Sequence, residues 1–332
     1  MKVLDLFAGA GGASLGAKQA GATLVGAAEW DPSACEAHRQ GLPGCPVFEG
    51  DLRQLDPPAA DVWWASPPCQ AWSSAGDRLG AQDPRNGWPW VWDLYDALPC
   101  EDRPQWLITE NVVGMTHHKS DGCGDPLACP GCYLSGVVIP ELRSRFRYVE
   151  ARILLAADFG VPQMRRRLFI VCGPEPYRWP TPTHCDPRQR LLLACGRQPW
   201  VTMGEALGLS RGTLHASGIT GASPPRSVSE VARSVTAKGT AYLNQPAPTV
   251  LATEAKGHTG VFADRGRASR IQRASDALAL ATGRRRLTVS ECAILQGFAK
   301  DYPFQGTKSA QYRQVGNAVP PAFARALIGV LA

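Results

Sequence analysis

The chain opens with the stretch MKVLDLFAGAGG (residues 1–12), in which an apolar run passes directly into a glycine-rich segment. The run at 3–7 has the length and composition of a buried strand, and residues 13–20 continue with a helical composition. Glycines at such a junction let the backbone approach a ligand closely, and they leave the N-terminus of the helix facing that ligand. The spacing Gly9-x-Gly11-Gly12 lacks the third glycine of the dinucleotide fingerprint, so it predicts a ligand site without specifying a dinucleotide.

Further apolar runs follow this first strand, at 23–28, 46–48, 62–65, 106–109, 153–156 and 168–172. They alternate with helix-like or Gly/Pro-rich intervals, which predicts an α/β fold with a mostly parallel, doubly wound sheet. Prolines cluster from Gly173 onward, and helical patterning resumes at about Leu287 with Thr288 or Ser290 as its N-cap. We expect four segments: a catalytic and cofactor-binding domain (1–173), a smaller loop-rich domain (174–286), a connecting helix (287–310) and a C-terminal segment that returns to the first domain (311–332).

The composition is that of a globular protein. The 332 residues are 44% hydrophobic, the mean hydropathy is −0.17, and no apolar stretch approaches membrane-spanning length. Because the strand pattern begins at once, we expect no signal peptide and a cytoplasmic, reducing location. The 11 cysteines are therefore not expected to form a disulfide framework.

Charge is distributed unevenly along the chain. Residues 1–65 contain four Lys/Arg against eight Asp/Glu, whereas residues 264–286 contain seven arginines against two aspartates. An acidic front and arginine-rich later segments favour one face for a small cofactor and another for a polyanion such as nucleic acid. Solvated arginine faces would explain the charge alone equally well.

Acidic residues follow three successive predicted strands. Asp5 and Glu29 come at the ends of the first two, and Asp51 follows the third. A carboxylate after the second strand is suited to accept ribose hydroxyls, and Asp51 is suited to accept from an exocyclic amine. Phe7 and Trp30 are candidates for stacking on a ring. The series predicts an adenosine-containing ligand, and the lack of a phosphate-binding cation here favours S-adenosylmethionine over a dinucleotide.

A single thiol follows the fourth strand, in the segment Ser66-Pro67-Pro68-Cys69-Gln70. The prolines fix φ and push the preceding residues toward extended geometry, so the loop is stiff. It places Cys69 at the carboxyl end of a strand, where open α/β sheets bind their ligands. Cys69 is therefore a candidate nucleophile, although a lone cysteine is more often a small buried hydrophobe.

Together these segments resemble the DNA (cytosine-5) methyltransferase family over nearly the whole chain. The motifs appear in the family's order: 5–12, Glu29-Trp30, Asp51, Pro67-Pro68-Cys69-Gln70, Glu110-Asn111-Val112, Gln163-x-Arg165-x-Arg167, 286–298 and Gly316-Asn317-Ala318-Val319-Pro320. One departure is Ser66, where the family usually has glycine. The resemblance implies a Rossmann-like S-adenosylmethionine-dependent methyltransferase fold, with residues 174–286 as a target-recognition domain inserted before the C-terminal helix.

The resemblance also implies an activity: methyl transfer to carbon 5 of a flipped cytosine in duplex DNA. Cys69 would form a covalent adduct at carbon 6, because carbon 5 is too electron-poor to attack a methyl group unaided. Glu110 would supply the proton at ring N3. Arg165 and Arg167 would hold the cytosine O2 and the catalytic loop, and their alternation predicts that they share one face of a strand.

Two further sets of residues follow from the matched motifs. The cofactor-binding set is Asp5, Phe7, Gly9, Gly11, Glu29, Trp30, Asp51, Pro67, Asn317 and Val319. The DNA-binding set is Gln70, Ser73, Gln163 and Arg286.

Two regions fall outside these motifs. Cys123, Cys129 and Cys132 lie in a Gly/Pro-rich insertion and are candidate ligands of a structural zinc ion, although their spacing is not a standard pattern. Trp88, Trp90 and Trp92 alternate in what reads as a loop, and we expect them to pack in the core rather than to line a groove.

Other functions remain open at this stage. A tRNA cytosine-5 methyltransferase would keep the chemistry and change the substrate, and a catalytically silent DNA-binding regulator would keep only the binding. A nicotinamide oxidoreductase fits least well, since the third glycine is missing. We expect a monomer that binds duplex DNA and no membrane. A companion restriction endonuclease is a further candidate partner.

Overall fold

The computed structural model describes residues 1–68, 86–116, 132–187, 196–208, 246–247 and 287–331. The chain divides into two compact units. Unit 1 comprises residues 1–155, 166–181 and 323–332, and unit 2 comprises residues 156–165 and 182–322. Each unit is described by itself below.

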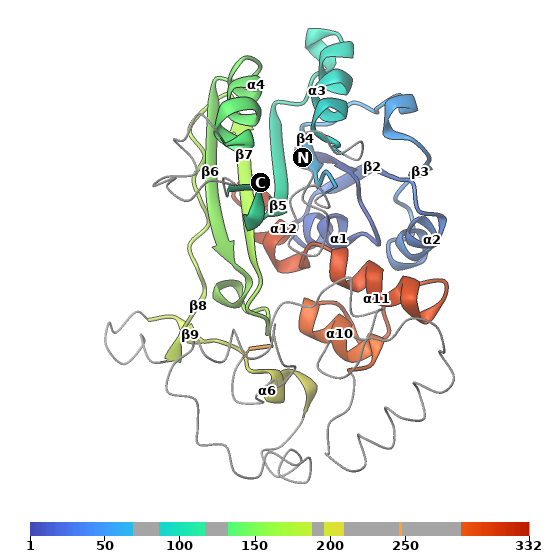
Figure 1. Ribbon diagram of the computed structural model, residues 1–332, viewed down its shortest axis with the longest axis vertical. Coiled ribbons are helices and arrows are strands. Elements are labelled where there is room, and N and C mark those ends of the chain that lie inside the picture. The colour runs from blue at the N-terminus through green and yellow to red at the C-terminus, as the bar shows by residue number, and fades with distance from the viewer. Residues whose placement is uncertain (69–85, 117–131, 188–195, 209–245, 248–286, 332) are drawn as a thin grey trace. The chain divides into compact units, whose positions relative to one another are not determined.

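Unit 1 is built on a seven-stranded sheet with strand order β3-β2-β1-β4-β5-β7-β6 (Figure 1). The strands are β1 (Lys2–Leu6), β2 (Thr23–Glu29), β3 (Val47–Glu49), β4 (Val62–Ala65), β5 (Trp106–Val112), β6 (Tyr148–Leu155) and β7 (Arg166–Gly173). The pairs among β1 to β5 are parallel, whereas β7 runs antiparallel to both β5 and β6. The predicted strands and the mostly parallel sheet are thus confirmed.

The strand order reverses at β1, whose neighbours are β2 on one side and β4 on the other. Loops that leave the carboxyl ends of β1 and β4 therefore run in opposite directions and open the ligand-binding position of doubly wound sheets. The antiparallel β7 begins where the parallel β5 ends, so residues near its start also lie at this edge. The fold thus gathers the ends of five strands and the start of a sixth.

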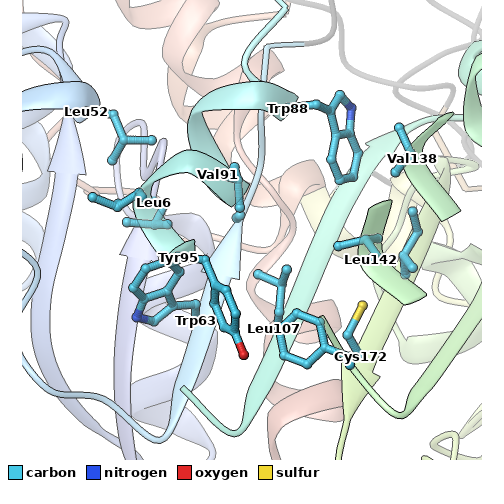
Figure 2. Packing of buried hydrophobic residues seen from close by; sticks show 14 of the residues in the cluster. Leu6, Leu52, Trp63, Trp88, Val91, Tyr95, Leu107, Val138, Leu142 and Cys172 are labelled. Atoms are coloured by element: carbon cyan, nitrogen blue, oxygen red, sulfur yellow. The ribbon is translucent and has the colours of Figure 1, made fainter. Parts of the chain in front are cut away.

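One face of the sheet packs against α3 (Trp88–Ala97), the π-helical turn η5 (Leu134–Val138) and α4 (Ile139–Arg143). Figure 2 shows Trp63 and Leu107 of the sheet against Tyr95 of α3, with Leu142 of α4 nearby. The rings of Trp63 and Tyr95 meet edge to face at 6.1 Å. Each aromatic side chain in this core removes more apolar surface from water than an aliphatic one does.

The other face of the sheet packs against α12 (Pro321–Ile328). Because side chains alternate along a strand, Trp64 points away from Trp63 and contacts Phe169, which in turn contacts Phe323 of α12. The Tyr177 hydroxyl donates to the Leu327 carbonyl at 2.6 Å. This helix lies within the C-terminal segment, 311–332, which was expected from the sequence to return to the first domain.

The tryptophan-rich segment differs from the prediction. Trp88, Trp90 and Trp92 belong to α3, not to a loop, although they do pack in or against the core as expected. Pro89 occupies the first turn of this helix, where its missing N–H has no intrahelical acceptor. A proline at this position is therefore compatible with the start of a helix.

Two helices, α1 (Gly12–Gln19) and α2 (Pro32–Gly41), connect the first three strands. Asp31 caps α2 by accepting from Ser33 N at 2.9 Å. The N-cap of α1 is Gly11, which has no side chain to offer. Short 3-10 turns complete the unit: η1 (Leu52–Gln54), η3 (Cys100–Asp102) and η4 (Val113–Thr116).

Unit 2 contains short elements in its described part: η6 (Ala156–Phe159), β8 (His184–Cys185), β9 (Gln198–Pro199), α6 (Met203–Leu207), α10 (Val289–Gln296) and α11 (Lys308–Asn317). Thr288 caps α10 and exchanges hydrogen bonds with Glu291, which confirms one of the two predicted caps. Most of the segment expected to recognise DNA, including Arg286, lies outside the described residues. None of the helices in the described ranges is long and apolar enough to cross a membrane.

Candidate active site

The loop after β4 is described as far as Pro68, so Cys69, Gln70 and Ser73 lie outside the described residues. Asn111 of β5 donates to the Pro67 carbonyl at 3.2 Å, which ties the start of this loop to the neighbouring strand. Ser66 accepts from the indole N–H of Trp64 at 3.0 Å. The serine that replaces the family's glycine therefore satisfies a polar group of the core.

Glu110 and Arg167 form an ion pair at the carboxyl end of β5. Arg167 stands opposite Val112 in the antiparallel register, so Glu110 is its diagonal neighbour on the same face. The Nε of Arg167 lies 2.8 Å from Oε1 of Glu110, and both side chains are about nine-tenths buried. This oxygen has no aligned hydrogen-bond donor within the described residues. The contact is therefore an ion pair without a well-oriented hydrogen bond. The carboxyl group thus keeps hydrogen-bonding capacity for a ligand.

Arg165 lies outside this arrangement. It immediately precedes β7, which begins at Arg166. Its guanidinium is buried in unit 2 and donates to the carbonyls of Gly316 and Ala318. Gln163 is also fully buried in unit 2, against the end of α10.

At the carboxyl end of β1, Asp5 belongs to a buried polar chain. Its Oδ2 accepts from the backbone N and the hydroxyl of Ser14, at 3.0 and 2.5 Å. The Ser14 hydroxyl lies 2.9 Å from Nε2 of His38. Because Ser14 is the third residue of α1, Asp5 supplies from the strand the N-terminal acceptor that Gly11 cannot provide.

Burial changes the protonation of both ends of this chain. Desolvation raises the pKa of Asp5 to about 7, against the opposing effect of its bonds to Ser14. Desolvation also lowers the pKa of His38 to about 4. Oδ1 of Asp5 and Nδ1 of His38 are both buried without a hydrogen-bond partner in the described part of the chain. The unpartnered carboxylate oxygen is available to a ligand.

Glu29 fixes the backbone at the end of β2. Its Oε1 accepts from Trp30 N and Asp31 N, both at 2.9 Å, and its Oε2 accepts from Gly9 N at 2.8 Å. Burial raises the pKa of this carboxyl, and the three N–H donors oppose the shift. A carboxylate offers about four acceptor positions, so Glu29 retains roughly one for a ribose hydroxyl. We call Asp5, Ser14, Glu29 and His38 the cofactor cluster.

The glycine-rich segment leaves space beside this cluster. Gly9 has φ +55°, and an added Cβ would meet nothing within 4 Å. Gly11 has φ +89°, and its Cβ would lie 2.8 Å from His38 Cδ2. Phe7 also has positive φ and stacks on Trp90 at 6.3 Å. Positive φ at both positions, together with the close approach of His38 at Gly11, explains why both are glycine.

Other predicted cofactor residues show different surroundings. Trp30 is 78% exposed, so its ring is free to stack on a ligand. Asp51 pairs with the exposed Arg53, and that hydrogen bonding lowers its pKa to about 2. Pro67 and Val319 are buried, and Asn317 is exposed at the end of α11. Their contact with a cofactor stays a prediction.

The cofactor cluster fits S-adenosylmethionine. Asp5 offers a buried acceptor without a partner, Gly9 has open space above it, and Trp30 exposes an aromatic face. Negative carboxylates also suit a cationic sulfonium. When bound, S-adenosylmethionine supplies an electrophilic methyl group.

Sequence reasoning missed Ser14 and His38. Ser14 had a weak signal, since a small polar residue in the first turn of a helix often bonds a neighbouring backbone or acid. His38 had none, because its partner lies 24 residues away and is brought to it only by the fold. Asn111 and Gln296 were part of the matched motifs, but their hydrogen bonds were not foreseen.

The zinc hypothesis gains no support. Cys123 and Cys129 lie outside the described residues, and Cys132 is buried beside the core. Among the residues that are described, no group of three or more histidines, cysteines or acids is arranged to hold a metal ion.

Comparison with known proteins agrees with this geometry. The family described as C-5 cytosine-specific DNA methylase matches residues 1–192 and 211–332. Type II methyltransferase M.NgoMIV of Neisseria gonorrhoeae is 30% identical over 337 residues, covering 98% of this chain and 95% of its own. M.AplI of Arthrospira platensis is 31% identical over 334 residues, covering 98% of this chain and 84% of its own.

Solved structures show the same fold. The Entamoeba histolytica methyltransferase EhMeth aligns over 100% of this chain and 97% of its own, with a TM-score of 0.65 and 15% identity. The S. pombe Dnmt2 methyltransferase aligns over 100% and 98%, with a TM-score of 0.64 and 17% identity. These similarities confirm the Rossmann-like methyltransferase fold. The family match over most of its length shows that this chain belongs to the C-5 cytosine-specific DNA methylase family.

Proposed function

We propose that this protein transfers a methyl group from S-adenosylmethionine to carbon 5 of a cytosine flipped out of duplex DNA. The observation that carries the proposal is the arrangement at the ends of β4 and β5. Asn111 holds the carbonyl of Pro67, two residues before Cys69, and the adjacent residue Glu110 is paired with Arg167. A proton donor and a cation therefore lie at the strand ends next to the point from which the chain continues to Cys69.

In the proposed reaction, the thiolate of Cys69 adds to carbon 6 of the cytosine. Glu110 donates a hydrogen bond or proton to N3 as charge builds on the ring, and Arg167 stabilises that charge. Carbon 5 would then attack the methyl group, with the sulfonium leaving as a neutral thioether. Loss of the proton from carbon 5 to a water molecule, departure of Cys69 from carbon 6 and return of the N3 proton to Glu110 restore the aromatic ring.

The Glu110–Arg167 pair has two roles in this scheme. Arg167 keeps Glu110 in place by charge. Oε1 of Glu110 has no aligned donor in the part of the chain that the structure describes, and is therefore left for the cytosine. Arg167 also supplies a positive charge that opposes the negative charge developing on the ring. A buried guanidinium paired with one carboxylate is suited to both roles, because its planar donors are not all engaged.

We also propose a biological role, a DNA-contacting segment, an oligomeric state and a cellular location for this protein. The curated relatives are named Type II methyltransferases, which supports a restriction–modification role for this chain. We expect the arginine-rich residues 264–286 to contact phosphates and the protein to act as a monomer. We also expect cytoplasmic action and a companion restriction endonuclease.

The test is incubation of the full chain with methyl-labelled S-adenosylmethionine and either unmethylated duplex DNA or tRNA. We expect 5-methylcytosine in DNA, and labelled tRNA alone would favour the alternative substrate. Cys69→Ser should abolish product, whereas a serine variant that methylates normally would contradict the covalent mechanism. Glu110→Gln should lower kcat roughly 10²–10⁴-fold. Glu36→Gln, a change of an exposed carboxylate on α2, is the matched control and should leave kcat unchanged.

DNA binding without any methyl transfer by the wild-type protein would favour the silent regulator instead. The two results are separable, because retention of labelled duplex measures binding and label incorporation measures chemistry.

A further inference from the structure

The end of α11 is held by side chains from two other segments of unit 2. Arg165 donates from Nη1 to the Gly316 carbonyl at 3.1 Å and from Nη2 to the Ala318 carbonyl at 3.2 Å. Gln296, the last residue of α10, donates from Nε2 to the same Ala318 carbonyl at 2.5 Å. Carbonyls in the last turn of a helix have no intrahelical donors, so these side chains satisfy groups that would otherwise be buried and unpaired.

The side chain of Gln163 fixes the orientation of the Gln296 amide. Gln163 donates from Nε2 to the Leu295 carbonyl at 3.0 Å and to Oε1 of Gln296 at 2.6 Å. Because Oε1 of Gln296 accepts from Gln163, its Nε2 points toward Ala318. We call Gln163, Arg165 and Gln296 the carbonyl clamp.

The clamp is completely removed from solvent. Gln163 and Gln296 are 0% exposed, and Arg165 is 1% exposed. Burying a guanidinium is costly unless its donors are satisfied. The C-terminus of α11 provides both carbonyl acceptors and the negative end of a helix dipole, which stabilises a cation there. The geometry therefore commits Arg165 to the backbone of residues 316–318.

Between the two clamped carbonyls lies Asn317, whose side chain is exposed, whereas Gly316 and Ala318 are buried. A backbone held on both sides of one residue sets the direction in which that side chain leaves. We propose that the carbonyl clamp positions Asn317 for cofactor binding and that Arg165 is a positioning residue rather than a catalytic one. This inference rests on the proposed function, in which Asn317 contacts S-adenosylmethionine.

The test compares Arg165→Met with Asn317→Ala and with Arg166→Met in the full chain. Arg166 is exposed and adjacent, so Arg166→Met is the matched control for loss of an arginine. Equilibrium binding measures the Kd for S-adenosylmethionine without DNA, and initial rates give KM and kcat. We expect Arg165→Met to raise Kd and KM about as much as Asn317→Ala, by roughly tenfold, with kcat at saturating cofactor within a few-fold of wild type. Arg166→Met should match wild type.

The double variant Arg165→Met/Asn317→Ala sharpens the test. If Arg165 acts through Asn317, the double variant binds cofactor no more weakly than either single variant, because both remove the same interaction. Multiplication of the two effects would contradict the proposal. So would a large fall in kcat with unchanged Kd, which would place Arg165 at the cytosine.

Folding is controlled with milder variants. Arg165→Lys keeps one cationic donor, and Gln163→Met removes the amide donors that orient Gln296 without placing a charge in the buried clamp. Both should raise Kd less than Arg165→Met does, whereas a role confined to stability would lower the melting temperature and leave the Kd of the folded protein unchanged. A wild-type protein that fails to bind S-adenosylmethionine would contradict the proposed function. A wild type that binds, with Arg165→Met equal to it, would contradict the clamp alone.

Discussion

The cofactor cluster and the carbonyl clamp both satisfy helix ends with side chains from elsewhere in the chain, but with opposite polarity. In the cluster, the carboxylates of Asp5 and Glu29 accept from backbone N–H groups at and before the start of α1. In the clamp, amides and a guanidinium donate to carbonyls at the ends of α10 and α11. Both follow the direction of the helix dipole.

The cofactor cluster and the carbonyl clamp differ in whether their side chains titrate. Carboxylates and an imidazole change charge in the accessible pH range, whereas amides and a guanidinium do not. The cluster is therefore sensitive to pH and to a cationic ligand, and the clamp is indifferent to both. A site that binds and releases a charged cofactor uses the first kind, and a fixed scaffold uses the second.

The largest expected effect on stability comes from introducing a carboxylate into the carbonyl clamp. Gln296→Glu replaces the donor to Ala318 with an acceptor that is fully buried, and should lower the free energy of unfolding at pH 8 by about 3 kcal/mol or more. At pH 5 part of the loss should return, because a protonated carboxyl again donates. Chemical denaturation at both pH values measures this. The matched control, Gln54→Glu on the exposed turn η1, should change stability by less than about 0.5 kcal/mol.

The next largest effect is a dependence of the free energy of unfolding on pH, which His38→Gln reveals. In this variant the glutamine Nε2 takes the place of the imidazole Nε2 near Ser14. Because the pKa of Asp5 is raised to about 7, its contribution to stability is lost as pH rises from about 4 to 7, and Glu29 acts in the same direction. Because the pKa of His38 is lowered to about 4, its contribution grows as pH rises from about 4 to 6.5. The opposing slopes partly cancel in the wild type.

In His38→Gln only the carboxylate slope remains. The free energy of unfolding should fall by roughly 2–3 kcal/mol between pH 5 and pH 8, at about 1.4 kcal/mol per unit while Asp5 titrates. Unfolding experiments across this range measure the slope. A variant as flat as the wild type would show that His38 does not oppose Asp5.

A smaller effect separates stability from binding in the cofactor cluster. Asp5→Asn removes a buried charge but keeps an acceptor for Ser14, so it should raise the free energy of unfolding at pH 8 by about 2 kcal/mol. The same change should weaken binding of cationic S-adenosylmethionine, because the unpartnered carboxylate oxygen is lost. Melting temperature and Kd are the two measurements, with the exposed Asp56→Asn as control. A loss of stability at pH 8 would contradict the assignment of a costly buried carboxylate.

The smallest effect compares two glycines. Both Gly9→Ala and Gly11→Ala force alanine into positive φ, at a cost of about 1–2 kcal/mol each. Only Gly11→Ala also meets His38, which cannot move without breaking its contact with Ser14. We expect Gly11→Ala to be about 1 kcal/mol less stable than Gly9→Ala in thermal unfolding. Equal losses would indicate that His38 is not fixed.

Sequence patterns identified the strands and the acids that follow them, because strand ends are local features. Asp5 and Glu29 were predicted as ligand-binding residues, and the structure places each at the end of its strand. The hydrogen bonds that occupy them were not predictable, since Ser14 and His38 are joined only by the packing of α1 and α2. Arg165 shows the same limit, because the carbonyls that it binds lie 151 and 153 residues away in the sequence.

The C-terminal helix has a consequence for how the protein is made. Phe323 and Leu327 of α12 complete unit 1 by contacting Phe169 and Tyr177, yet all of unit 2 between 182 and 322 is translated before them. The part of the sheet that α12 covers therefore stays exposed while the ribosome synthesises about 140 further residues. We expect nascent chains to present this apolar surface, including Phe169, until α12 has been synthesised.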